Sequence, residues 1–125
     1  LSISQLCELT GTVIVSTPQD VALIDAVKAA KMFTKVEIDV LGIVENMSFF
    51  ACPKCGEETP IFSRYGAEET SKKIQAPFLG AIPIELEVRK GGDDGKPLMA
   101  SNLDSPASMA FKNIADNLVK VLEEG

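Results

Sequence analysis

The sequence contains no histidine and no tryptophan, and only one tyrosine. Without histidine the chain has no Ser-His or Cys-His catalytic pair and no Cys₂His₂ zinc site. It also lacks the G-x-x-x-x-G-K-[ST] loop that cradles phosphates, so these residues do not make a complete nucleotide-hydrolysing site. These absences leave cysteine, amide and carboxylate side chains as the groups that can carry chemistry.

Positive charge and long apolar runs are scarce as well. The formal net charge is −6 at pH 7, which argues against sequence-independent binding of nucleic acid. No apolar run approaches the ~20 residues of a membrane span, and Leu1–Gln5 lacks the basic start and apolar stretch of a secretory signal. The three cysteines fit a reducing compartment. We therefore expect a single-domain cytoplasmic protein without nucleic-acid or membrane partners.

Three short runs are almost continuously apolar. A strand that is covered on both faces in a parallel sheet has this pattern, whereas a half-exposed strand alternates. The runs predict buried strands at Thr12–Ser16, Val40–Val44 and Phe78–Ile82.

Helical segments alternate with these strands. Thr17 is the expected N-cap of the first helix, with Pro18 at the first helical position and Asp20 as a capping-box acid. Apolar periodicity and terminal signals predict helices at Val21–Phe33, at roughly Ala67–Gln75, and from Ser105 to about Glu123. Together the segments predict an α/β fold over residues 1–125, with a parallel sheet flanked by helices and an irregular cysteine loop at about 47–65.

Polar residues follow each predicted strand, at the edge where parallel α/β sheets bind ligands. Asn46 carries both a donor and an acceptor and can pair with a purine base, although without further context a strand-end Asn that bonds its own loop is the favoured interpretation. Thr17 and Gln19 are candidates for contact with a phosphate or its bound water, while the helix cap alone accounts for Thr17. Pro83 lies at the same edge and is either a site residue or only a strand terminator.

Cys52 and Cys55 form a C-x-x-C pair within Cys-Pro-Lys-Cys-Gly, a spacing that suits metal ligation or redox chemistry. A thioredoxin-like pair precedes a helix, and the Gly56–Pro60 stretch does not read as a helix start. A zinc-ribbon half-site is the second interpretation. The third is a site shared by two chains across a twofold axis, because two copies supply four thiolates. Cys7 stands alone in an apolar context and is expected to be a buried residue.

The ordered set of these motifs resembles the C-terminal half of the Mrp/ApbC-type P-loop ATPases, the MinD-like iron–sulfur cluster carriers. The matching segments are Gly11–Ala26, Val40–Ser48, Cys52–Gly56, Ile61–Phe62, Phe78–Pro83 and Gly91–Pro97. The resemblance covers essentially the whole chain, which lacks the family's Walker A and Walker B segments.

The resemblance implies a partial MinD-like fold that dimerises around nucleotide. It implies a [4Fe-4S] cluster bridged by Cys52 and Cys55 of two subunits, with apo iron–sulfur proteins as acceptors. Asn46 would face the adenine with Pro83 nearby, and Thr17 to Gln19 would lie on the phosphate side of bound ATP and Mg²⁺ in the full-length protein. The cytoplasm is the expected location and a mitochondrial or plastid matrix the alternative. A zinc-bridged interaction domain and a MinD/ParA-like positioning ATPase remain alternative functions.

We expect this chain by itself to hydrolyse no ATP, because ATP binding depends largely on a phosphate cradle and Mg²⁺. Phosphate release from Mg-ATP should equal the buffer background. A metal-dependent turnover that disappears in Asn46→Ala would contradict this prediction.

Overall fold

The computed structural model describes residues 9–51, 54–55, 57–59, 66–84, 93–96 and 105–124. In these residues the central sheet contains three parallel strands in the order β1-β2-β5. The strands are β1 (Thr12–Ser16), β2 (Val40–Glu45) and β5 (Phe78–Ala81). The predicted α/β class is confirmed, and each predicted strand ends within one residue of the observed one.

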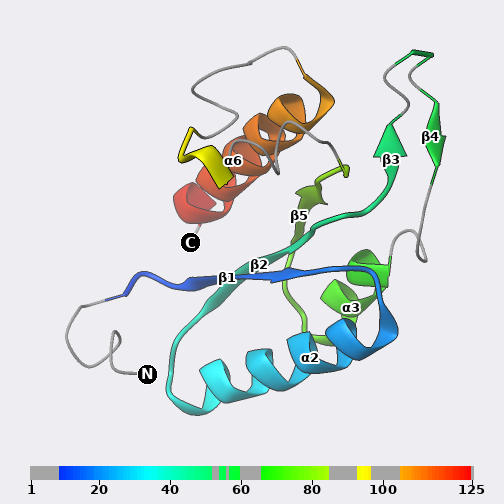
Figure 1. Ribbon diagram of the computed structural model, residues 1–125. Helices are drawn as coiled ribbons and strands as arrows, with labels where there is room; N and C mark the ends of the chain where they lie inside the picture. The colour runs from blue at the N-terminus through cyan, green and yellow to red at the C-terminus, as the bar shows by residue number, and fades with distance from the viewer. Residues whose placement is uncertain are drawn as a thin grey trace.

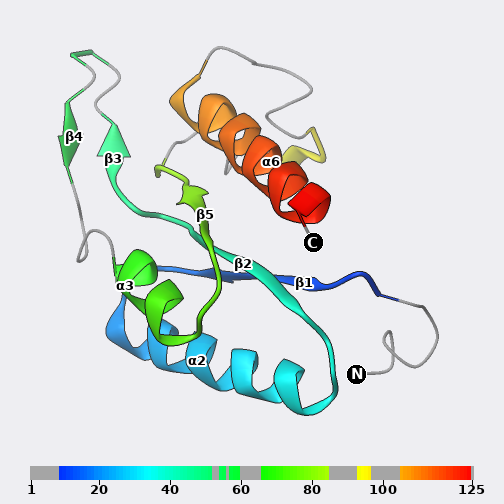
Figure 2. The same ribbon diagram turned by 180° about the vertical axis from the view of Figure 1, so that it is seen from behind.

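Helices cover both faces of this sheet (Figures 1 and 2). One face packs against α2 (Asp20–Lys35) and α3 (Gly66–Lys73), and the other packs against α6 (Pro106–Glu124). No helix in the described part of the chain is both long and apolar enough to cross a membrane.

The apolar strands follow from this three-layer arrangement. Successive strand residues point to opposite faces, so Ile14 and Ile43 join the core under α2 and α3. Val13, Val44 and Leu79 join the second core, under α6. Both alternating sets must be apolar because both faces are covered, which gives the near-continuous runs seen in the sequence.

Helix α2 begins later than its capping signals predicted. Its N-cap is Gln19, whose backbone is extended and whose side chain makes no capping bond. The carbonyl of Gln19 accepts the first helical bond, from Leu23 N–H at 3.0 Å. Thr17 as N-cap is therefore wrong: its hydroxyl donates to Gln19 Oε1 at 3.4 Å, and the buried Pro18 lies before the helix instead of within its first turn.

The C-terminus of α2 closes in a Schellman-type turn. Ile38 N–H donates to Phe33 O at 2.9 Å and Glu37 N–H donates to Thr34 O at 3.2 Å. This places Glu37 at φ 60°, in the left-handed region where glycine is favoured. Gln75 follows α3 with a similar φ of 56°.

Replacing Glu37 with glycine should stabilise the protein by about 0.5–1 kcal/mol, because glycine adopts positive φ without the steric cost of a Cβ. Chemical denaturation measures the free energy of unfolding. Glu37→Ala is the control, since alanine removes the same carboxylate but keeps the Cβ. A Glu37→Gly protein no more stable than Glu37→Ala would contradict this account.

A two-stranded hairpin extends the chain beyond the end of β2. Strand β3 (Phe50–Ala51) pairs antiparallel with β4 (Glu58–Thr59), and Figure 1 shows the hairpin projecting past the sheet. The expectation of an irregular loop over residues 47–65 is thus wrong at these two strands. A two-residue strand has too few positions to show a periodic pattern.

Candidate functional site

The carboxyl ends of the three strands lie side by side, and backbone hydrogen bonds join them. Glu45 pairs with Ser16 of β1 on one side and with Ala81 of β5 on the other. Just beyond, Asn46 N–H donates to Ser16 O at 2.8 Å and Ile82 N–H donates to Glu45 O at 2.7 Å. The polar residues that follow these strands are therefore gathered at one edge of the sheet.

Asn46 supports its own loop, which was one of the two interpretations of the sequence. Its Oδ1 accepts the N–H of Met47 at 2.9 Å, and Met47 has a φ of 55°. The Asn46 side chain is half-buried, and its NH₂ group has no partner within the described ranges. The amide can therefore hold the loop and still donate a hydrogen bond to a ligand.

The other three candidates at this edge differ in accessibility. Thr17 is half-buried and Gln19 is exposed, and their side chains bond each other. Pro83 is buried, so it shapes the edge without presenting a polar group. Only Asn46 among the predicted edge residues combines partial burial with a free donor in the part of the chain that the structure describes.

Cys55 lies in the turn between β3 and β4, next to Lys54, and its thiol is exposed and free of a disulfide. Its predicted partner Cys52 and the isolated Cys7 both fall outside the described residues. No group of three or more His, Cys, Asp or Glu side chains converges as a metal site within the described segments. According to the sequence, one chain thus contributes two cysteines, Cys52 and Cys55, to this hairpin.

The root of the hairpin is tied to the strand edge. Ser48 N–H donates to Ile82 O at 2.9 Å and Ile84 N–H donates to Phe49 O at 2.6 Å. Phe50 then forms a parallel bridge with Ile84. The β2–β5 ladder therefore continues, past a short break, into the first strand of the cysteine hairpin.

Reasoning from the sequence missed Glu45 as a central residue of this edge. Its side chain has no exposed surface. Its Oε1 accepts from Ser48 Oγ at 2.5 Å, and its Oε2 accepts from the backbone N–H of Ala67 at 3.0 Å. The available signal was a carboxylate that continues a fully apolar strand, on the same face as Ile43.

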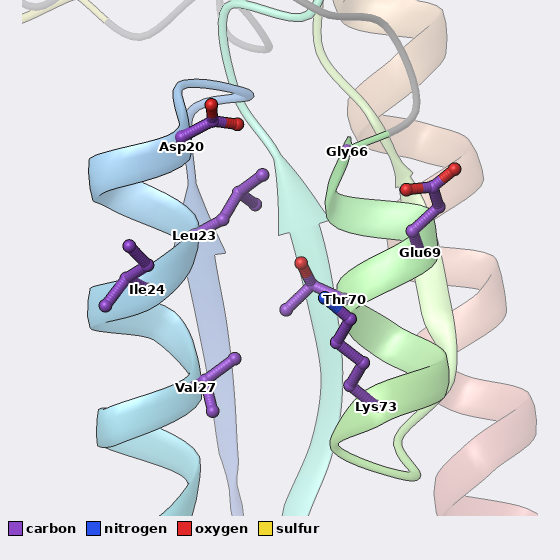
Figure 3. A pocket seen from close by; sticks show the side chains of 8 residues that line it. All are labelled: Asp20, Leu23, Ile24, Val27, Gly66, Glu69, Thr70 and Lys73. Carbon is purple, nitrogen blue, oxygen red and sulfur yellow. The ribbon is translucent and has the colours of Figure 1, made fainter.

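A separate groove of about 580 Å³ opens between α2 and α3 (Figure 3). Leu23 and Thr70 point toward each other across it. The helices can approach closely here because a Cβ at Gly66 would lie 2.8 Å from Leu23 Cδ1. None of the edge residues predicted from the sequence lines this groove, which is formed by Asp20, Leu23, Ile24, Val27, Gly66, Glu69, Thr70 and Lys73.

The family model described as ParA, the NUBPL iron-transfer P-loop NTPases, matches residues 1–119. The chain belongs to this iron-transfer family. It is 50% identical over 123 residues to the iron-sulfur cluster transfer protein NUBPL of Dictyostelium discoideum, covering 98% of this chain and 38% of that protein. It is 48% identical over 124 residues to the iron-sulfur protein required for NADH dehydrogenase, mitochondrial, of Arabidopsis thaliana, covering 99% and 40%.

The iron-sulfur cluster carrier protein of Escherichia coli is 43% identical over 122 residues, with 98% of this chain and 33% of that protein covered. The chain thus spans about two fifths or less of these relatives' lengths.

Solved structures show the same fold. The nucleotide-binding protein of Archaeoglobus fulgidus in complex with ADP superposes with a TM-score of 0.70 at 36% identity, over 88% of this chain and 44% of that one. The cell division ATPase MinD of Pyrococcus furiosus gives a TM-score of 0.67 at 22% identity, over 90% and 43%. The second likeness concerns the fold alone, and the predicted partial MinD-like architecture is confirmed.

Substitutions at Asn46 measure how much its contact with the loop contributes to the stability of the apo protein. Asn46→Ala removes the acceptor for Met47 N–H and should lower the free energy of unfolding by about 0.5–1.5 kcal/mol. Asn46→Asp keeps an acceptor oxygen and should stay within about 0.5 kcal/mol of the wild type. Denaturant titration of the apo protein measures both, and equal stability of the alanine variant and the wild type would show that the loop contact contributes nothing.

Proposed function

We propose that this chain is the cysteine-bearing part of an iron–sulfur cluster carrier and that Cys52 and Cys55 bind the cluster as cargo. The observation that carries the proposal is Cys55, an exposed thiol at the tip of a hairpin anchored to the strand edge. Thiolates are the ligands that iron–sulfur clusters prefer. An exposed position also lets a cluster leave for an acceptor.

The cluster is of the [4Fe-4S] type and is shared by two copies of the protein. Such a cluster takes about four thiolates, and the hairpin of one chain carries Cys52 and Cys55 alone. A twofold axis through the hairpin tips brings two identical patches together and supplies the missing pair. The site is therefore a homodimer site, and apo iron–sulfur proteins are its acceptors.

The strand edge contributes to nucleotide binding in the whole protein. In this proposal the half-buried Asn46 pairs with adenine, Pro83 shapes the same edge, and Thr17 and Gln19 contact the phosphate side of the nucleotide. ATP with Mg²⁺ would require a phosphate loop, which this sequence does not contain. Support for a nucleotide comes from the ADP bound by the Archaeoglobus fulgidus relative.

Support for the location comes from the relatives' names and from composition. The Arabidopsis relative is named as mitochondrial, and carriers also occur in bacteria such as Escherichia coli. The protein acts either in the cytoplasm or in an organelle matrix. Both are reducing enough to keep the cysteine thiols free for iron.

Anaerobic reconstitution with iron and sulfide tests the cysteine assignment. The wild type should take up about four irons per pair of chains and develop a visible chromophore. Cys55→Ser and Cys52→Ser should each abolish both signals. Cys7→Ser is the matched control and should keep them.

Two outcomes would contradict the proposal. Stoichiometric zinc in the anaerobically purified protein, with no uptake of iron, would favour a zinc-bridged interaction domain that uses the same cysteines. Normal iron uptake in both Cys52→Ser and Cys55→Ser would place the cluster elsewhere.

A further inference from the structure

The carboxylate of Glu45 is buried where the sheet, the cysteine hairpin and α3 meet. Glu45 is 0% exposed, and its two donors belong to residues that are almost as buried, Ser48 at 1% and Ala67 at 0%. The contacts are Ser48 Oγ to Oε1 at 2.5 Å and Ala67 N–H to Oε2 at 3.0 Å. Both oxygens of one buried acid are thus occupied by two different segments.

Those two segments are the ends of the stretch that carries the cysteines. Ser48 lies two residues before the first strand of the hairpin, and Ala67 is the second residue of α3. Cys52 and Cys55 lie between them in the chain. A single side chain therefore fastens the beginning and the end of the cysteine segment to the same point.

The backbone of Glu45 is itself held in place. Its carbonyl accepts from Ile82 N–H at 2.7 Å, and the next bond along this ladder runs from Ser48 N–H to Ile82 O at 2.9 Å. The carboxylate thus projects from a rigid strand end toward the first turn of α3. A negative charge is favourable there, because the free N–H groups of a helix start carry partial positive charge.

Packing alone does not require a carboxylate at this position. Burying a charge is costly, and well-packed apolar residues replace buried ionic groups without loss of stability in many proteins. The carboxylate adds directional hydrogen bonds, because each of its two oxygens fixes the position of one donor. An apolar side chain of similar size would fill the space but would tie neither end of the cysteine segment.

We propose that Glu45 is a positioning residue for the cysteine pair. Its carboxylate holds together Ser48 and Ala67, the two roots of the cysteine segment, and so sets how slowly a bound cluster is released from the thiolates. The inference rests on the proposed cluster-binding function of Cys52 and Cys55. Loss of either tie should loosen the hairpin and speed the escape of the cluster. The two apolar cores are built from other side chains as well, on both faces of the sheet.

The test measures cluster release from the full-length protein. Anaerobically reconstituted wild type, Glu45→Met and Ser48→Ala are mixed with excess iron chelator, and the loss of the visible chromophore is timed. Measurement takes place well below the melting temperature of every variant. Release should be about fivefold faster in both variants, as expected from the loss of a buried hydrogen bond of typical strength.

Two further variants separate positioning from general stability. Glu45→Gln can accept from Ala67 N–H and donate to Ser48 Oγ, so it should restore release to near the wild-type rate. Ser71→Ala removes another buried hydroxyl, whose bond to Glu68 O lies within α3 and touches neither root. It should release the cluster at the wild-type rate even where its melting temperature falls.

A second measurement does not need a cluster. Amide hydrogen exchange of Ala67 in the apo protein should accelerate severalfold in Glu45→Met and remain unchanged in Ser71→Ala, because this N–H is bonded to the carboxylate. Unchanged exchange at Ala67 would overturn the inference even if the wild type binds no iron.

Wild-type release rates in Glu45→Met and Ser48→Ala would also overturn the inference, as would equal acceleration in Ser71→Ala. A third outcome separates the two proposals. If the wild type binds no iron while Glu45→Met accelerates exchange at Ala67, the proposed function is contradicted and the anchoring of the two roots is still supported.

Discussion

At the carboxyl edge of the sheet, one buried carboxylate accepts hydrogen bonds from two segments that are distant in sequence. Glu45 binds Ser48 at the start of the cysteine segment and Ala67 at its end. The exposed thiol of Cys55 is carried by a hairpin that begins at this point. The start of the hairpin is thus held by a polar contact at its base and by the strand ladder.

The remainder of the structure provides the rigid support that this contact needs. Two apolar cores cover the sheet, one under α2 and α3 and the other under α6. Because the cores fix β2 between two parallel neighbours, the end of β2 is a precise location for polar groups. Asn46 follows Glu45 directly, so the edge that we propose for nucleotide binding and the cysteine hairpin share one strand end.

Much of this arrangement could be predicted from the sequence. Continuous apolar runs identified all three sheet strands, because a strand covered on both faces has no polar side. The start of α2 was placed too early, since Thr17 and Pro18 carry capping signals while tertiary packing buries Pro18 before the helix. Local signals do not report that burial.

The candidate site was only partly predictable for a similar reason. Asn46 and the cysteines have side chains whose chemistry is visible in the sequence alone. The role of Glu45 depends on Ala67, twenty-two positions along the chain, and no local pattern reveals such a contact. The hairpin strands were missed because each has two residues, fewer than a period-two pattern needs.

A crystal structure of the anaerobically reconstituted protein, with data collected at the iron absorption edge, tests the central claim most directly. The account predicts an anomalous iron peak between the hairpin tips of two copies, bonded to Cys52 and Cys55 of each. It also predicts that Glu45 still contacts Ser48 and Ala67 beneath each hairpin. Iron bound away from these cysteines, or a Glu45 carboxylate turned away from both donors, would contradict it.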